Sequence, residues 1–143
     1  MRRYAIYGTL AAAVLLGGAI AFTRSNADTP APARVFELRT YYVNEGKMPD
    51  LHKRFRDHTV RIFRNHGMTP IGFWEPQTKE DGRGDKMVYL LAFPSREAAK
   101  KAWKEFGEDP EWKKVYAESH KNGVLVKKVE SVFLDPLDYS EIK

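Results

Sequence analysis

The sequence contains no cysteine, which excludes disulfide scaffolds, thiolate metal sites and a cysteine nucleophile. Its 10 glycines and 8 prolines are too few for a collagen-like or low-complexity chain, and its 143 residues show no internal repeat. It also lacks the histidine spacing of a helical metal site, the serine motif of common hydrolases, and the lysine and helix of a phosphate-binding loop. We therefore expect no metal, no cofactor, and one mixed-charge domain that can bury a core.

Acidic residues are absent from the first 24 residues, which carry Arg2, Arg3 and Arg24. Without these three arginines the chain keeps 21 of its 24 basic residues against 19 acidic ones, so most of the net charge of +5 lies at the N-terminus. Basic residues in the rest of the chain alternate with acids, as in residues 100–105. This pattern is typical of a solvated helix face, and we expect no binding of nucleic acid.

The N-terminal region has the pattern of an export signal. Residues 5–22 form an uncharged run of 18 residues after a short basic start, and Ser25 and Ala27 have the spacing that a signal peptidase reads. The run is also close to the minimum length of a membrane-spanning helix. We expect residues 1–27 to be a signal peptide or an N-terminal membrane anchor, so that the protein is exported and is either periplasmic or tethered to the membrane. Residues 28–34 are a Pro/Ala-rich linker.

Residues 35–136 have the element order of one α+β domain, followed by an irregular tail at 137–143. Hydrophobic periodicity and capping residues predict strands at 35–43, 69–77, 86–93 and 124–134, and helices at 48–66, 95–106 and 109–120. The order βαββαβ is that of the ferredoxin-like fold, a four-stranded antiparallel sheet with helices on one face. The first and third strands are central in this topology.

The strand at 86–93 is apolar on both faces, with Met87, Tyr89, Leu91 and Phe93 alternating with Val88, Leu90 and Ala92. Because helices cover only one face, a second copy of the sheet is the simplest cover for the other, and we expect a homodimer. The apolar side chains at 36, 38 and 40 are expected to face the helices. Glu37 and Arg39 would then face the partner.

Three groups of short segments resemble the NIPSNAP family. They are residues 36–41 with 46–47, residues 66–67 with 71–74, and residues 102–103 with 109–112. The resemblance covers residues 35–136 and implies a dimeric α+β barrel. The wider barrel group includes cofactor-free monooxygenases, haem-degrading enzymes and plain binding proteins. We therefore expect an exported small-molecule-binding or interaction module. The alternative is a cofactor-independent monooxygenase-like enzyme acting on a small hydrophobic or aromatic substrate.

Glu37, Arg39 and Tyr41 alternate along a central strand and therefore share one face of the sheet. Three interpretations are open. In the first, the two charges form an ion pair inside the chain or across a dimer. In the second, Arg39 holds an anionic or carbonyl ligand while Tyr41 donates a hydrogen bond. In the third, the pair is exposed at the sheet edge. Glu37, Arg39 and Tyr41 are candidate ligand-binding residues, and Tyr41 is also a candidate catalytic residue.

Two further candidates come from the remaining aromatic and histidine residues. His58 lies near an apolar helical stripe, where it is either a hydrogen-bonded core histidine or a catalytic proton shuttle. Trp74 either lines a ligand cavity or packs in the core or at an interface. His66 and His120 end predicted helices and are interpreted as structural. The ligand is expected to be small and hydrophobic or anionic, and membrane contact is expected only through the N-terminal segment.

Overall fold

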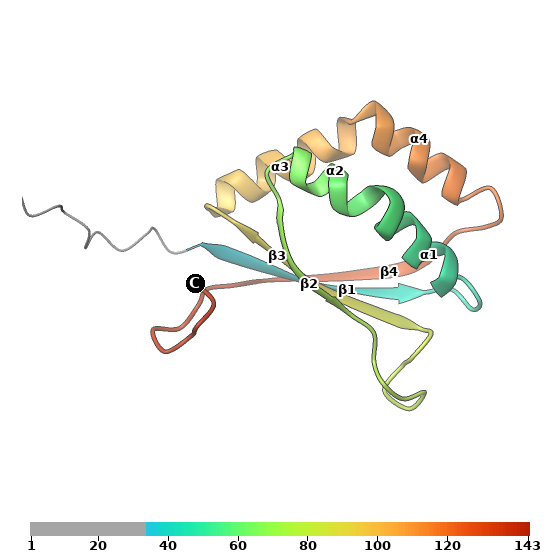
Figure 1. The fold of residues 1–143 in the computed structure, drawn as a ribbon, viewed down its shortest axis with the longest axis horizontal. Helices are drawn as coiled ribbons and strands as arrows, with labels where there is room; N and C mark the ends of the chain where they lie inside the picture. The colour runs from blue at the N-terminus through green and yellow to red at the C-terminus, as the bar shows by residue number, and fades with distance from the viewer. Residues whose placement is uncertain (1–33) are drawn as a thin grey trace, which may run out of the picture.

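The computed structural model describes residues 34–143 (Figure 1). The predicted signal or anchor segment and nearly all of the linker lie outside this range. No helix within residues 34–143 has the length and apolar character needed to cross a membrane. The elements are β1 (Val35–Val43), α1 (Met48–Arg54), η1 (Phe55–Thr59), α2 (Val60–Asn65), β2 (Thr69–Trp74), β3 (Lys86–Phe93), α3 (Arg96–Glu108), α4 (Pro110–Ser119) and β4 (Val126–Leu134).

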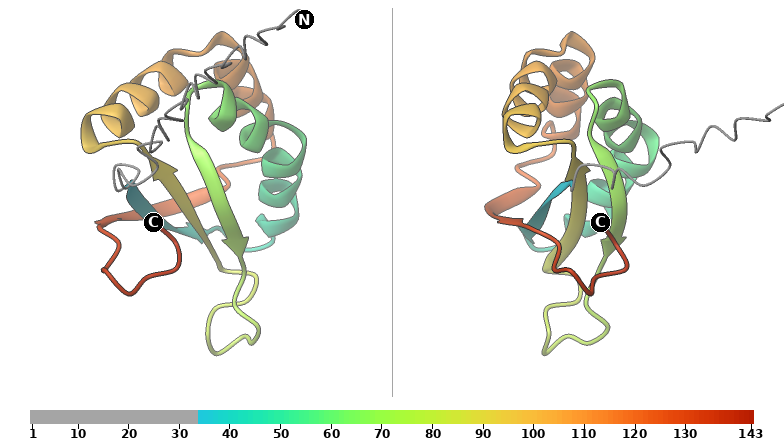
Figure 2. Two further views of the ribbon diagram at one scale, coloured as in Figure 1. Left: turned by 60° about the vertical axis from the view of Figure 1, so that its left-hand side comes forward. Right: turned by 90° about the vertical axis from the view of Figure 1, so that its left-hand side faces the viewer.

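The four strands form one antiparallel sheet in the order β2-β3-β1-β4. Strands β1 and β3 are therefore central, and the predicted α+β, ferredoxin-like class is confirmed. The helices lie together on one side of the sheet, and among the described residues no helix covers the other side (Figures 1 and 2). We call this other side the open face. A single chain does not test the expected dimer, which stays a prediction.

The first helical segment runs without a break from α1 through η1 to α2, but its middle is one turn of π-helix. A π-turn inserts one extra residue into the helix and shifts the following residues around its axis. Thr59 is consequently buried and its hydroxyl donates to the carbonyl oxygen of Arg54 at 3.2 Å. Both Ile62 and Phe63 then face the sheet and are buried.

The core lies between the helices and the sheet. Its centre is a set of aromatic rings in which Phe63 contacts Phe55, Tyr89, Trp103 and Phe106 with ring centroids 5.0–6.1 Å apart. Such edge-to-face and tilted pairs add to the free energy gained from burying the rings.

One predicted orientation was wrong: Glu37, Arg39 and Tyr41 lie on the helix side of β1. In an antiparallel sheet, directly paired residues share a face, and Glu37 pairs with Leu91 while Arg39 pairs with the fully buried Tyr89. The open face instead carries a mainly apolar set, namely Phe36, Leu38, Thr40, Trp74, Val88, Leu90, Ala92, Val132 and Leu134, together with the charged Glu130. The charged pair is tolerated inside because the two charges neutralise each other and both carboxylate oxygens of Glu37 accept hydrogen bonds there.

The corner between α3 and α4 is fixed by Asp109. One of its carboxylate oxygens accepts from the backbone N–H groups of Glu111 and Trp112, at 2.7 and 3.0 Å, and so caps α4. The other lies 2.7 Å from Nε2 of His66, which follows the end of α2. The hydrogen bond from His66 lowers the pKa of Asp109 from its ordinary value. Asp109 therefore joins the two helical segments as well as capping one of them.

Replacing Asp109 with alanine is expected to lower the free energy of unfolding by about 1–2 kcal/mol, because the cap is lost. Asp109→Asn keeps a capping oxygen and should lose less. Since the pKa of Asp109 is lowered on folding, the contribution of its charge is present above the ordinary carboxyl pKa and is lost as the pH falls through the lowered value. Urea unfolding at several pH values should show the gap between wild type and Asp109→Asn closing in acid. A constant gap would contradict this assignment.

Candidate functional site

The carboxylate of Glu37 is the centre of a buried polar cluster beneath α3. The residue is 1% exposed. Its Oε1 accepts from Nη1 of Arg39 at 2.8 Å and from Oγ of Ser131 at 2.6 Å, while Oε2 accepts from Nε1 of Trp103 at 2.5 Å. Donors from β1, β4 and α3 therefore converge on one carboxylate and satisfy it. Of the three interpretations of this pair, the structure shows the ion pair within the chain.

The guanidinium of Arg39 is held between a carboxylate and aromatic rings. Its carbon lies 4.2 Å from the centroid of the Trp103 indole and 5.7 Å from that of Tyr41. Both distances are within the range of a cation–π contact. Only its Nε is buried without a hydrogen-bond partner. The charge of Arg39 is thus compensated inside the chain by the carboxylate of Glu37 and by the two rings.

Tyr41 extends the cluster toward the aromatic core. The hydroxyl of Tyr89 donates to the hydroxyl of Tyr41 at 2.9 Å, and the two rings meet edge to face with centroids 5.2 Å apart. Burial raises the pKa of Tyr89 well above its ordinary value. Its phenol therefore stays protonated and keeps donating over the physiological pH range.

The cluster reaches the surface through the indole of Trp103. That ring also lines a hollow of about 380 Å³ beside β4, together with Arg96, Glu97, Lys100 and Phe133. The hollow is rimmed by charged side chains of α3. A ligand there would contact the outer face of Trp103.

His58 lies elsewhere, in a pocket of about 230 Å³ between the first helical segment and α4. That pocket is lined by Arg54 and Ser119 but not by Tyr41 or Arg39, so the structure does not gather the candidate catalytic residues around one cavity. Arg54 was not among the sequence candidates. Its spacing of three residues from Leu51 places it on the buried side of the helix, and this spacing was the signal that could have found it.

Trp74 is half-exposed at the end of β2. It pairs with Val88 and so belongs to the open face, and it also borders a pocket of about 240 Å³ at the sheet edge, between β2 and the first helical segment. The lining is largely aromatic and apolar, and comprises His52, Phe55, Arg56, Val60, Phe73, Trp74, Glu75 and Met87. The indole of Trp74 also lies over Gly72, where a Cβ would come within 2.5 Å of the ring. A side chain at position 72 would therefore force the indole to move.

His52 and Glu75 form a pair at this pocket that the sequence pattern did not predict. Nε2 of His52 lies 3.2 Å from Oε2 of Glu75, whose Oε1 accepts from the backbone N–H of Gly84 at 2.7 Å. Burial works in the opposite direction, but the hydrogen bonds from Gly84 and His52 hold the pKa of Glu75 below its ordinary value. The pair joins α1 to the end of β2, 23 residues later in the sequence.

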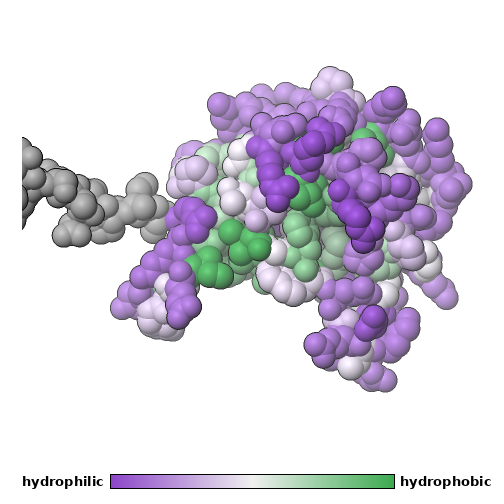
Figure 3. Space-filling model, viewed as in Figure 1, coloured by the Kyte–Doolittle hydropathy of each residue, from purple (hydrophilic) through white to green (hydrophobic). Residues whose placement is uncertain are grey.

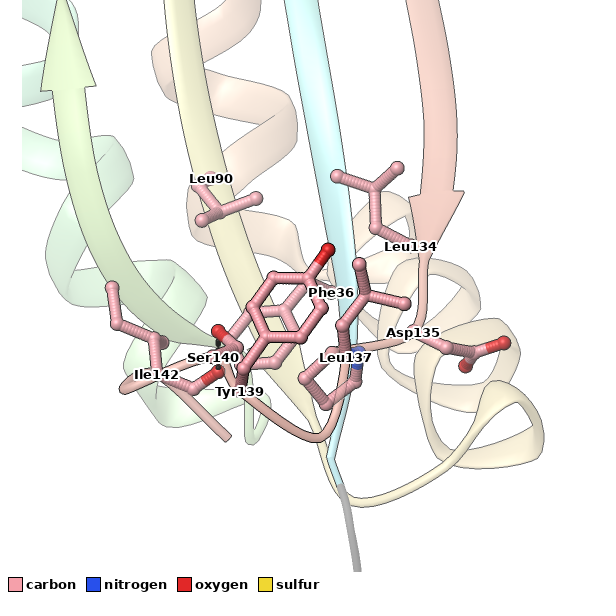
Figure 4. A pocket seen from close by; sticks show the side chains of 9 residues that line it. Phe36, Leu90, Leu134, Asp135, Leu137, Tyr139, Ser140 and Ile142 are labelled. Atoms are coloured by element: carbon pink, nitrogen blue, oxygen red, sulfur yellow. Dashed lines mark hydrogen bonds between the residues drawn. The ribbon is translucent and has the colours of Figure 1, made fainter.

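A fourth cavity, of about 420 Å³, lies on the open face (Figure 4). Leu90 and Leu134 project into it from the sheet, and Leu137 and Tyr139 border it from the C-terminal tail (Figure 4). The tail is tied to the start of β1, because Nε of Arg34 donates to the backbone oxygen of Lys143 at 2.7 Å. This pocket is apolar apart from a few groups of the tail, and it suits a hydrophobic ligand.

No three side chains of histidine, aspartate or glutamate gather as a metal site in the part of the chain that the structure describes.

Comparisons with known proteins agree on the family. The NIPSNAP family model matches residues 36–141. A NIPSNAP family protein of unknown function from Agrobacterium tumefaciens is 20% identical, with a TM-score of 0.68 over 78% of this chain and 96% of that one. An uncharacterized NIPSNAP domain protein from Burkholderia xenovorans is 23% identical, with a TM-score of 0.62 over 74% and 97%. No curated protein matches the sequence.

A more distant structural relative is an enzyme. SnoaB, a cofactor-independent oxygenase from Streptomyces nogalater, is 11% identical, with a TM-score of 0.50 over 74% of this chain and 95% of that one. At this identity the likeness concerns the fold alone. The family match covers most of the chain and the predicted resemblance is confirmed: the chain belongs to the NIPSNAP family.

Proposed function

We propose that this protein is a homodimeric binding module that holds a small hydrophobic ligand at the open face of its sheet. The observation that carries the proposal is the apolar open face, which none of the helices in residues 34–143 covers. At its centre Leu38 pairs with Leu90 on one side and Val132 on the other, and Val132 is 53% exposed. Such a contiguous apolar surface is typical of an interaction site.

The distribution of polar surface supports the same assignment. The helix layer is mostly hydrophilic, whereas hydrophobic residues gather on the sheet side next to the C-terminal tail (Figure 3). A second copy of the chain presents the same apolar set, so a two-fold dimer would bury both sets against each other. The open-face pocket lies at the edge of this surface, and the partner would close its mouth.

The dimer is tested by sedimentation velocity at micromolar concentration. We expect the wild type to sediment as a dimer and Leu90→Arg to sediment as a monomer with an unchanged circular dichroism spectrum, because a buried charge would have no partner. Val124→Arg is the matched control, since Val124 is exposed but precedes β4 and lies outside the open-face set. A monomeric wild type, or a dimeric Leu90→Arg, would contradict the proposal.

Ligand binding is tested separately with N-phenyl-1-naphthylamine, an uncharged hydrophobic probe that fluoresces in apolar sites. We expect saturable binding by the wild type and its loss in Leu137→Asp, which places a charge in the lining of the open-face pocket. Tyr116→Asp changes an exposed side chain on α4 by the same charge and should leave binding unchanged. Equal binding by all three proteins would place the probe elsewhere and contradict the assignment.

A cofactor-independent oxygenase acting on a small aromatic substrate is the second candidate function. It is favoured by the aromatic pocket at β2, because the His52–Glu75 pair there can accept a proton from a phenolic substrate. Oxygen uptake with a panel of small hydroxyaromatic compounds tests it, with His52→Ala as the inactive variant. The absence of oxygen uptake by the wild type would contradict the oxygenase function, and ligand binding would remain as the proposed function.

We also propose that the protein is exported, as residues 1–27 predict. Fusing residues 1–33 to a reporter that is active only outside the cytoplasm tests this. An inactive reporter would contradict it.

A further inference from the structure

Among the described residues, the buried cation of Arg54 has no carboxylate partner. The residue is 5% exposed at the end of α1, and within residues 34–143 it takes part in no ion pair. Its guanidinium makes one side-chain hydrogen bond, a long one of 3.3 Å from Nη1 to the neutral hydroxyl of Ser119. Its Nε is buried without any partner. A guanidinium has five N–H donors, so most of its capacity is unused.

The surroundings of Arg54 compensate its charge only weakly. The guanidinium carbon lies 5.2 Å from the ring centroid of Trp112, 5.7 Å from that of Tyr116 and 6.0 Å from that of Phe55. Cation–π contacts of this kind are weaker than a hydrogen-bonded ion pair. Burial lowers the pKa of Arg54 from its ordinary value, because removing a guanidinium from water disfavours its charged form. A contrast is Arg39, which is partly buried but pairs with Glu37.

Arg54 lines a cavity that a small molecule can enter. The pocket has a volume of about 230 Å³ and lies between the first helical segment and α4. The π-turn starts at the next residue, and π-turns occur frequently at functional sites. The other lining residues are mostly polar, namely Asp50, Lys53, His58, Val115, Glu118, Ser119 and Asn122.

We propose that this pocket binds a small organic anion through a carboxylate that pairs with the guanidinium of Arg54. A carboxylate matches the two-pronged donor geometry of a guanidinium and would occupy its free N–H groups. Asp50 and Glu118 also line the pocket and offset the positive charges of Lys53 and Arg54, so the lining favours a singly charged anion over a doubly charged one such as phosphate. The volume of about 230 Å³ suits a small molecule. This site lies on the helix side and is independent of the open-face pocket.

Calorimetric titration of the full chain with sodium butyrate, at ionic strength fixed with sodium chloride, tests the proposal. We expect saturable binding by the wild type and an affinity at least about tenfold lower in Arg54→Met, because the charge-assisted hydrogen bonds are lost. Arg64→Met is the matched control, since Arg64 is exposed on α2 and its loss changes the net charge equally. Its affinity should equal that of the wild type. Butyrate should also raise the melting temperature of the wild type but not that of Arg54→Met.

Arg54→Lys keeps the charge without the two-pronged geometry, so its affinity should lie between those of the wild type and Arg54→Met. If Arg54→Met does not fold, the test rests on Arg54→Lys. A butyrate affinity of Arg54→Lys equal to that of the wild type then overturns the proposal. The absence of saturable binding by the wild type, or equal affinity in Arg54→Met, overturns it as well. A parallel titration with sodium phosphate tests the ligand class: tighter binding of phosphate than of butyrate would overturn the assignment to a carboxylate.

Discussion

Replacing Arg39 with methionine is expected to lower the free energy of unfolding by about 3–5 kcal/mol, the cost of removing one partner from a buried ion pair. Glu37 is 1% exposed and would keep the hydrogen bonds from Trp103 and Ser131 but lose its counter-charge. The indole of Trp103 would also lose the cation above its ring. Denaturant unfolding at pH 7 measures the change.

The double variant Glu37→Gln/Arg39→Met should recover much of this loss, because the uncompensated charge is gone and the amide oxygen still accepts a hydrogen bond. Glu37→Leu is less suitable than Glu37→Gln for the double variant, since leucine would leave the donors of Trp103 and Ser131 unpaired. Arg96→Met is the control. Arg96 is exposed and its guanidinium lies over the ring of Phe133, so its loss should cost about 0.5–1 kcal/mol. If the single and double variants are equally unstable, Arg39 does not serve as the counter-charge of Glu37.

The topology could be predicted from the sequence because it depends on local patterns. The alternation along residues 86–93 defines a strand, Ser95 and Asp109 mark helix starts, and Gly67 marks a helix end. The order of these elements then leaves the ferredoxin-like sheet as the simplest arrangement. One boundary that differs from the prediction is the end of β2: the strand ends at Trp74, three residues before its predicted end, because the chain turns away from β3 there.

The side of β1 that faces the helices could not be predicted in the same way. Both faces of β1 and β3 carry apolar side chains, so alternation alone did not decide between them. The side of β1 that faces the helices is decided by the hydrogen-bond donors that stabilise the buried carboxylate of Glu37. Trp103 and Ser131 are 66 and 94 residues away from it in the sequence, and no local pattern connects them. A polar residue in a strand is therefore a weak guide to the exposed face when distant donors can satisfy it.

The π-turn explains why the candidate site was only partly predicted. Regular helical spacing from Leu51 and Phe55 leads equally to His58 or Thr59, but the extra residue of the π-turn places Thr59 in the core. His58 is left at the rim of the Arg54 pocket. The same shift brings Phe63 into the core. Phe63 was not singled out, because its burial depends on this local change of helical phase.

Replacing Phe63 with alanine is expected to lower the free energy of unfolding by about 3–5 kcal/mol, since the ring leaves a cavity that its neighbours cannot fill. Phe63 is 1% exposed, and its ring centroid lies 5.0 Å from that of Phe106 and 5.5 Å from that of Trp103. Losing it should also loosen Trp103, which holds the buried carboxylate of Glu37. Chemical denaturation and near-UV circular dichroism would record the two effects.

Phe73→Ala is the matched control for this change. Phe73 belongs to the same set of rings, with its centroid 5.7 Å from that of Phe55 and 5.6 Å from that of Tyr89, but it is 37% exposed at the sheet edge. Water already reaches this ring, so its removal creates no closed cavity and should cost clearly less than the loss of Phe63. Equal costs would mean that the aromatic centre is no more tightly packed than its edge. Trp103 would then be held in place by contacts elsewhere in α3 and not by Phe63.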